Sequence, residues 1–339
     1  MNINQSNHIE PGAGIPGGEV LIELERSAAG SIVQVLFGDT DAHIVAATGR
    51  RALVLIPEVS GESQVELLAG DKRTASESMP FVAGRRLASE VHPVANPAFD
   101  PSDGSLFVTK SGSRGEHVPV SLYRLNLNYD VEEFPAEITN PTGIAFDRTG
   151  RMFVTSRLDG VVYRVSPLKE VVAFAGELGI ATGLAFNRHG EMFVGDRTGK
   201  IYQVNEIGEP KPWAENEPSV SAYHLAFGPD DGLYVTGPTV SSFDSIVRFD
   251  EHGERQVFYR GLGRPQGLAF DRDGNLYVAA SLRGRRGIVR ISPDGRDARI
   301  VVAGMNLVGL AFSGTGEMVV ATNNALYSLP LGIYGTLLD

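Results

Sequence analysis

The fold of this chain is decided by Pro265-Gln266-Gly267-Leu268-Ala269-Phe270-Asp271 and by the Gly274-Asn275-Leu276-Tyr277-Val278 that follows it. Two short apolar runs are separated by a turn that holds aspartate and glycine. Apolar runs of this length, bounded by turn residues, are typical of β-strands. Aspartate bonds the backbone of a tight turn and glycine takes positive φ there, so the stretch predicts a β-hairpin.

This hairpin pattern occurs six times between residues 97 and 320. The phenylalanine that ends its first strand recurs at intervals of roughly 40 to 47 residues, about the length of one four-stranded propeller blade. A third and a fourth strand follow within the repeats, for example at residues 161–165 and 171–174. The repeats therefore predict an all-β fold that contains a six-bladed β-propeller. The six copies are marked by Phe99, Phe146, Phe186, Phe227, Phe270 and Phe312.

The last repeat stops after its third strand, so its outer strand has to come from elsewhere in the chain. The stretch Met79-Pro80-Phe81-Val82-Ala83-Gly84 is similar to the fourth-strand copy Val301-Val302-Ala303-Gly304 and precedes the first repeat. We expect residues 79–84 to complete the last blade, because closure of the ring would cover two exposed sheet edges.

Residues 79–339 resemble the NHL-repeat and senescence-marker/gluconolactonase class of six-bladed propellers. These repeats carry the same Pro-x-Gly-(Ile/Leu)-Ala-Phe-Asp pattern as Pro265–Asp271. The resemblance implies the propeller fold. It does not imply an activity, because the repeated residues are structural.

Residues 1–78 lack the repeat. They carry Pro16-Gly17-Gly18 before an apolar strand, a Phe37-Gly38-Asp39 turn and an apolar strand that ends in Ile56-Pro57. Several alternating strands in so short a segment predict a small β-sandwich. The order of these features resembles the immunoglobulin-like IPT/TIG domains, which implies a spacer or a protein-contact module.

The composition limits the possible partners. The chain has no cysteine, a formal net charge of −11 and no apolar run long enough to span a membrane. Such acidity argues against a protein that coats nucleic acid, since phosphates attract an excess of Lys and Arg. The sequence predicts a cytoplasmic protein without a membrane span, unless a leader has been removed.

The resemblance to gluconolactonases also points to an axial funnel. In that class, the residue before the glycine of each inner strand faces the funnel, and carboxylate and amide oxygens there hold a divalent cation. None of the corresponding residues here is a carboxylate, so we expect no metal site and no cofactor. The six ligand-binding funnel positions are Ala95, Thr142, Thr182, Tyr223, Gln266 and Val308.

Two histidines lie near this ring. His224 replaces the usual glycine beside Tyr223, and His92 precedes the first inner strand. Either could act as the general base of a hydrolase. The competing interpretation is that each fills space or bonds a backbone carbonyl, because no carboxylate partner is identified by spacing.

A basic rim departs from the overall acidity, although acidic residues map to the same loops and make the rim mixed. These acidic residues are Glu116, Asp159, Asp196, Glu215, Glu217 and Asp244. The rim maps to loops of the face on which six-bladed propellers usually bind. It is either ordinary solvated surface or a site at which guanidinium groups recognise an anionic partner. Its members are Lys110, Arg114, Arg157, Arg197, Arg264, Arg283, Arg285 and Arg286, of which Arg283, Arg285 and Arg286 form the densest cluster.

The sequence thus favours a non-catalytic scaffold that binds a protein or small ligand on this propeller face. Two alternatives stay open: a hydrolase of the lactonase or esterase type that uses the funnel, and a structural part of a larger assembly.

Overall fold

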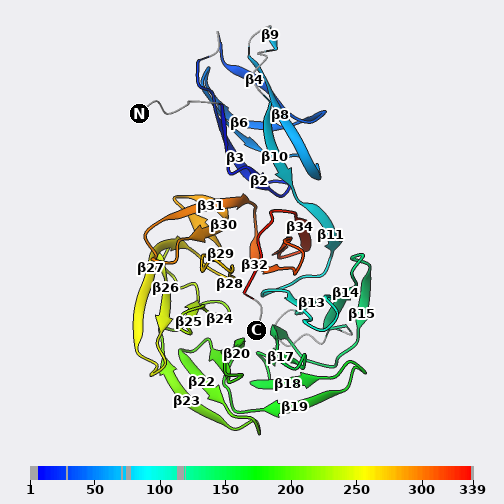
Figure 1. Cartoon of the computed structure of the whole chain (residues 1–339), viewed down its shortest axis with the longest axis vertical. Helices are drawn as coiled ribbons and strands as arrows, with labels where there is room; N and C mark the ends of the chain where they lie inside the picture. Colours follow the sequence, from blue (N-terminus) through cyan, green and yellow to red (C-terminus); the bar gives the residue numbers. More distant parts are fainter. Residues whose placement is uncertain are drawn as a thin grey trace.

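The computed structural model describes residues 7–27, 30–69, 72–73, 78–112, 118 and 120–336. Every regular element in these ranges is a β-strand, as the repeats predict. Figure 1 shows a small sandwich of N-terminal strands, drawn in blue, and a ring of sheets that follows the chain from cyan to red. The described part of the chain has no helix of the length and apolarity needed to cross a membrane.

The N-terminal part consists of two sheets packed on one core. Val20 and Ile22 of one sheet and Phe37 of the other are buried in it, and the rings of Phe37 and Phe81 meet edge to face at 5.0 Å. One face of each sheet therefore lies in a shared apolar core. The first sheet has the order β1 (His8–Glu10), β3 (Glu19–Glu23), β7 (Arg51–Leu55), β6 (His43–Ala47). The second is one end of a longer sheet, and its order there is β2 (Ala13–Gly14), β10 (Met79–Ala83), β8 (Gly61–Ala69), β4 (Ile32–Phe37), β5 (Thr40–Asp41), with β9 (Lys72–Arg73) paired to β8.

The ring is built from antiparallel groups of four strands, one group for each repeat, and we call these groups blades 1 to 6. Blade 1 holds β12 (Ala98–Phe99), β13 (Leu106–Thr109), β14 (Leu122–Leu125) and β15 (Val131–Phe134). Blade 2 holds β16 (Pro141–Phe146), β17 (Met152–Ser156), β18 (Val161–Val165) and β19 (Val171–Ala175). Blade 3 holds β20 (Ala181–Phe186), β21 (Met192–Asp196), β22 (Lys200–Val204) and β23 (Pro210–Glu215).

The second half of the ring continues in chain order. Blade 4 holds β24 (His224–Phe227), β25 (Leu233–Thr236), β26 (Asp244–Phe249) and β27 (Arg255–Gly263). Blade 5 holds β28 (Leu268–Phe270), β29 (Leu276–Leu282), β30 (Arg285–Ile291) and β31 (Ala298–Ala303). Blade 6 holds β32 (Leu307–Phe312), β33 (Met318–Thr322), β34 (Ala325–Leu329) and, from before blade 1, β11 (Arg85–Ser89).

The hairpin turns have the expected chemistry. Asp147 Oδ1 accepts hydrogen bonds of 2.9 Å from the backbone N–H groups of Thr149 and Arg151, and Gly150 has φ 78°. Asp271 and Gly274 repeat this arrangement in blade 5. The Asp271 side chain therefore accepts hydrogen bonds from the backbone of its own turn, which confirms the hairpin turn that the sequence predicts.

Inner strands of neighbouring blades approach each other most closely at the repeated glycine. A Cβ on Gly143 would lie 2.8 Å from the carbonyl oxygen of Thr182, and a Cβ on Gly309 would lie 2.7 Å from that of Ala95. Neither gap admits a side chain, so the packing of inner strand on inner strand requires glycine. The Gly309 contact joins blade 6 to blade 1.

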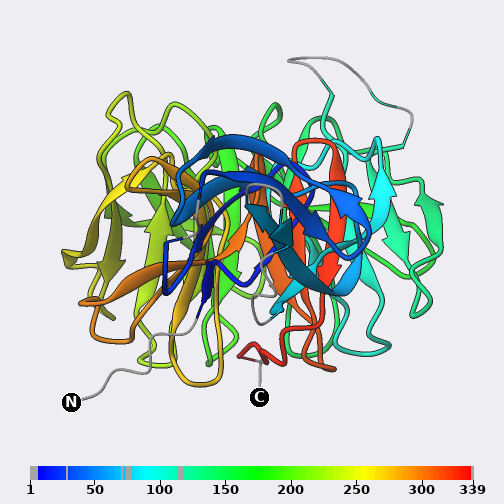
Figure 2. The same cartoon turned by 90° about the horizontal axis from the view of Figure 1, so that it is seen from above.

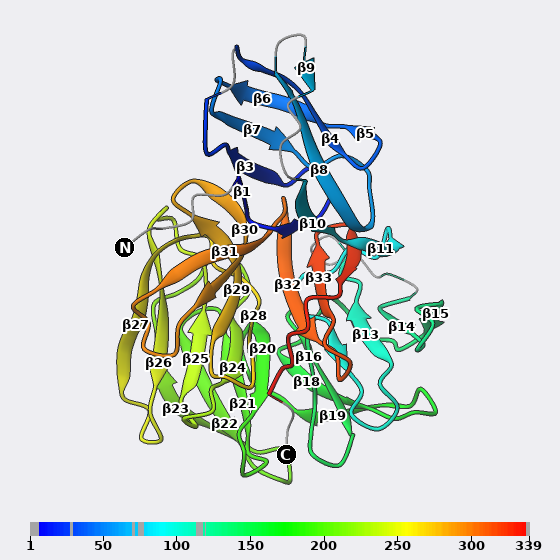
Figure 3. The same ribbon diagram turned by 45° about the horizontal axis from the view of Figure 1, so that its top comes forward.

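The prediction that residues 79–84 complete the last blade is wrong. Met79, Phe81 and Ala83 alternate into the core of the sandwich, and β10 pairs with β8 and β2. The next strand, β11, pairs antiparallel with β34 and is the outer strand of blade 6. Figure 3 shows the chain passing from β10 in the sandwich into β11 in the ring. The alternating apolar pattern of β10 serves the sandwich, and the strand that pairs with β34 is the next one along the chain.

The sandwich meets the ring through β2. This strand lies parallel between β10 and β31, and the Ile15 N–H donates a 2.9 Å hydrogen bond to the carbonyl of Ala303. A Cβ on Gly14 would lie 2.8 Å from that same carbonyl oxygen. Figures 2 and 3 show the blue strands against the orange strands of blade 5. The junction is therefore a continuous sheet with close backbone contact.

Candidate functional site

The residues expected to line the axial funnel form a packed layer. Ala95, Thr142, Thr182, Tyr223 and Val308 are all buried, and Gln266 is partly exposed. The Thr182 hydroxyl donates to the carbonyl of Gly195 at 3.4 Å and accepts from the Tyr223 N–H at 2.9 Å. The Thr142 hydroxyl donates to the carbonyl of Asn140 at 3.4 Å. These hydroxyls are used in internal hydrogen bonds.

Threonines of the second strands donate hydrogen bonds to the backbone of this layer. Thr155 Oγ1 donates to the carbonyl of Thr182 at 2.9 Å, and Thr109 Oγ1 donates to that of Thr142 at 3.1 Å. In blade 4, Thr236 Oγ1 donates to the carbonyl of Gln266 at 2.5 Å. Each bond runs from one blade to the next, so this level of the ring holds blades together.

The expected general bases lie in different surroundings. His224 is 4% exposed, and burial lowers the pKa of its imidazole to about 4. Its Nε2 is buried and has no hydrogen-bond partner in the part of the chain that the structure describes. His92 is exposed and has φ 44°. Among the described residues, neither histidine forms an ion pair with a carboxylate, and no group of three His, Asp or Glu side chains could hold a metal ion.

Tyr223 is also fixed by the fold. Its phenolic OH donates to the carbonyl of Glu217, and burial together with the charge of Asp196 raises the pKa of the phenol. The phenol stays protonated at neutral pH and is already bonded.

A cleft between blades 5 and 6 brings four of the predicted site residues together. It is a cavity of about 250 Å³. Gln266 and Val308 come from the expected funnel, and Arg264 and Arg286 come from the expected basic rim. The other polar side chains in its wall are Ser281, Asn306 and Asn323.

Among the described residues, no carboxylate forms an ion pair with Arg264 or Arg286. Arg264 has φ 47° and stands three residues before the glycine position of its inner strand. Asn140, with φ 45°, and Asn306, with φ 56°, take the same position in blades 2 and 6. Asparagine tolerates this left-handed conformation, whereas arginine adopts it at a cost. Within the described ranges, the cleft combines two guanidinium groups that have no carboxylate partner with amide and hydroxyl groups.

Arg285 does not belong to the basic rim. Its Nη2 donates hydrogen bonds to the backbone carbonyls of Glu10 at 2.6 Å and Glu19 at 3.2 Å, so it ties blade 5 to the sandwich. Arg283, at the tip of the same hairpin, is exposed. The predicted cluster thus divides into Arg285 at the junction, Arg283 at the exposed hairpin tip and Arg286, which is also exposed, in the wall of the cleft.

The remaining members of the rim lie on blades 1 to 3. Lys110 packs over the ring of Tyr123 at 5.6 Å, and Arg157 and Arg197 follow β17 and β21, each half-buried. Arg114 lies outside the described residues.

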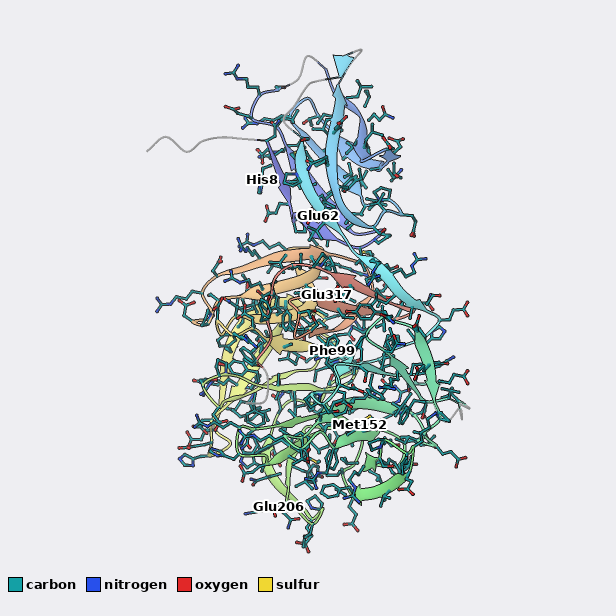
Figure 4. The ribbon with its side chains drawn as sticks, turned by 45° about the vertical axis from the view of Figure 1, so that its right-hand side comes forward. His8, Glu62, Phe99, Met152, Glu206 and Glu317 are labelled. Carbon is teal, nitrogen blue, oxygen red and sulfur yellow. The ribbon has the colours of Figure 1, made fainter. Side chains whose placement is uncertain are left out.

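A larger cavity, of about 970 Å³, opens at the opposite end of the ring. Phe99 and Glu317, labelled in Figure 4, belong to its lining. Its wall holds the residue that follows the glycine position in each inner strand, namely Pro97, Ile144, Leu184, Leu225, Leu268 and Leu310. No sequence pattern described above predicted this cavity, although the aliphatic residue that recurs after the glycine position marks its wall.

Most charged groups at the mouth of that cavity are already satisfied. Arg188 pairs with Asp231 at 3.1 Å. Glu317 accepts hydrogen bonds from the Tyr129 phenol and from Ser328 Oγ. The wall of this cavity is mainly aliphatic and aromatic, whereas the cleft holds Arg264 and Arg286 without carboxylate partners among the described residues. The cleft is therefore the better candidate site for a charged ligand.

Comparisons with known proteins identify the fold alone. The sequence matches no model of a protein family and no curated protein. A gluconolactonase from Xanthomonas campestris superposes with a TM-score of 0.60 at 18% identity, over 73% of this chain and 89% of its own. An auxiliary nutrient binding protein from Bacteroides thetaiotaomicron superposes with a TM-score of 0.57 at 13% identity, over 96% of this chain and 98% of its own. A virginiamycin B lyase from Staphylococcus aureus gives a TM-score of 0.50 at 15% identity, over 72% and 86%. The chain is thus similar to β-propellers with different activities.

Proposed function

We propose that the chain is a non-catalytic binding scaffold whose cleft between blades 5 and 6 takes a small polyhydroxylated carboxylate, that is, a sugar acid. The observation that carries this proposal is the presence of Arg264 and Arg286 in one cavity without a carboxylate partner among the described residues. Guanidinium groups bind carboxylates through paired, charge-assisted hydrogen bonds.

The neutral groups in the cleft suit the rest of such a ligand. Gln266, Asn306 and Asn323 offer amide donors and acceptors, and Ser281 offers a hydroxyl. A wall with two cations and four neutral hydrogen-bonding groups fits a carboxylate that carries hydroxyl groups. The whole-length likeness to a nutrient binding protein supports a binding role of this kind.

We also propose two domains, with the boundary at Gly84 instead of the expected 78/79, because β10 belongs to the sandwich. The first is an immunoglobulin-like domain of the IPT/TIG kind, and the second is a six-bladed propeller that β11 closes. The sandwich packs on Ala303, next to Gly304 in the wall of the cleft, so it would set the position of that wall.

A hydrolase of the lactonase type is the second candidate, favoured by the likeness to a gluconolactonase. Such catalysis needs a base and a means to polarise a carbonyl. The buried, unpaired His224 does not supply either, so the binding role is preferred.

Isothermal titration calorimetry with gluconate tests the proposal. The intact chain should bind gluconate and not glucose, and R264Q and R286Q should each bind about tenfold more weakly. R148Q, which changes an exposed arginine at the other end of the ring, should bind like the unchanged chain. Equal affinities for gluconate and glucose would overturn the proposal. Turnover of gluconolactone would favour the hydrolase.

A further inference from the structure

Three polar residues occupy one register in three successive blades. Each stands three residues after the buried valine of its second strand, and the three are Ser111, Arg157 and Arg197 in blades 1, 2 and 3. In blades 5 and 6 the same register holds Ser281 and Asn323, which line the cleft described above. Ser111, Arg157 and Arg197 therefore lie at the same face of the ring, across from that cleft.

The contacts of Arg157 place it beside Ser111. Arg157 Nη2 donates a 3.2 Å hydrogen bond to the carbonyl of Gly112, the residue that follows Ser111. The Ser111 hydroxyl oxygen is buried and has no hydrogen-bond partner among the residues that the structure describes. Burial and the nearby positive charge of Arg197 lower the pKa of the Arg157 guanidinium. The two guanidinium groups are therefore close enough to repel each other.

The neighbouring carboxylates are engaged with other groups. Asp159 Oδ2 accepts from Ser156 Oγ at 3.0 Å and from the Tyr163 phenol at 3.2 Å. Asp196 accepts from the Ile180 N–H at 3.0 Å and from the Thr198 hydroxyl at 2.5 Å. In the part of the chain that the structure describes, neither Arg157 nor Arg197 forms an ion pair with a carboxylate.

Two adjacent, half-buried cations without a counter-charge are unfavourable in the free protein. A monoanion would balance only one of them, whereas a dianionic oxyanion balances both and can accept from two guanidinium groups and a hydroxyl. We propose that Arg157, Arg197 and Ser111 form a second binding site, specific for a phosphate group, on the same face as the sugar-acid cleft. The site uses none of the residues of that cleft, so each can exist without the other.

Calorimetric titration of the full chain with inorganic phosphate, glycerol phosphate and acetate tests this site. Phosphate should bind with a stoichiometry of about one, and R157Q and R197Q should each weaken binding by about tenfold or more. Glycerol phosphate binding as tightly as inorganic phosphate would identify a phosphate monoester as the ligand, and its exclusion would identify the free ion. Acetate should bind much more weakly than either.

Matched variants keep the test decisive. The Arg197 side chain forms no hydrogen bond or ion pair with the described residues, so R197Q and R197K should fold normally even if R157Q does not. R197K keeps the charge but loses the planar fork, and it should bind phosphate with intermediate affinity. R264Q should not change phosphate binding, which separates this site from the cleft. Phosphate binding that is unchanged in R197Q, or equal affinity for acetate and phosphate, would overturn the inference.

Discussion

The Arg285 guanidinium donates a 2.6 Å hydrogen bond to the backbone carbonyl of Glu10, so a side chain of the ring is bonded to the first strand of the sandwich. The same Nη2 donates to the carbonyl of Glu19, and the Arg285 Nε is buried without a hydrogen-bond partner in the described ranges. A guanidinium that bonds two carbonyls of another sheet stabilises the junction and is not available to a soluble partner.

Arg285→Gln should destabilise the junction between the sandwich and the ring. Loss of a charged hydrogen bond of this kind costs about 1.5–3 kcal/mol. Hydrogen exchange at β2 and β31 should be faster in R285Q, while exchange in blades 2 and 3 stays unchanged. Arg283→Gln, at the exposed tip of the same hairpin, is the control and should leave exchange as it is. Equal exchange in the two variants would contradict the assigned role.

Deletion of residues 1–89 should destabilise the ring far more than deletion of residues 1–84. Both truncations remove the sandwich, but only the first removes β11 and exposes the edge of β34. The melting temperatures of the two truncated proteins can be compared directly. If they coincide, β11 does not stabilise blade 6 and the closure is assigned to the wrong strand.

Thr155→Val should lower stability although it preserves the size of the side chain. The Thr155 hydroxyl accepts from the Gly143 N–H at 2.8 Å and donates to the carbonyl of Thr182, so valine leaves two buried polar groups unsatisfied. The expected loss is about 1–3 kcal/mol in the free energy of unfolding, measured by urea denaturation. Thr40→Val, at an exposed position of β5, is the control. A loss no larger than that of the control would show that the bond between blades contributes little.

His224 should make stability depend on pH. Its pKa is lowered to about 4 in the folded chain from an ordinary 6.5, so the unfolded chain binds the proton more tightly. The contribution is fully present above the ordinary pKa and is lost as the pH falls from about 6.5 towards about 4. The melting temperature should therefore fall less over this range in H224Q than in the unchanged chain. Parallel pH profiles for both proteins would mean that the imidazole titrates normally.

Some of this structure could be predicted from local pattern and some could not. The Phe99 to Phe312 repeat predicted the blades because a glycine, an apolar run and an aspartate turn are sufficient to specify a hairpin. The closing strand was misassigned because Met79–Ala83 alternates as well as Ala298–Ala303 does. Alternation shows that one face is buried, but not in which core.

The candidate site was predicted only in part for a similar reason. Register placed Gln266 and Val308 near the axis, and loop position placed Arg264 and Arg286 on one face. The role of Arg285 depends on the sandwich folding back onto blade 5, a contact between residues far apart in the chain. No local pattern reports such a contact. Figure 4 shows the two parts of the molecule, with His8 and Glu62 in the sandwich and Met152 and Glu206 in the ring.

The most direct test of the proposed function is a crystal structure of the chain with gluconate. We expect electron density for the ligand in the cleft between blades 5 and 6, with its carboxylate bonded to Arg264 and Arg286 and its hydroxyl groups facing Gln266, Asn306 and Asn323. Gluconate found in the larger cavity at the opposite end of the ring, or an empty cleft at saturating gluconate, would contradict the proposal.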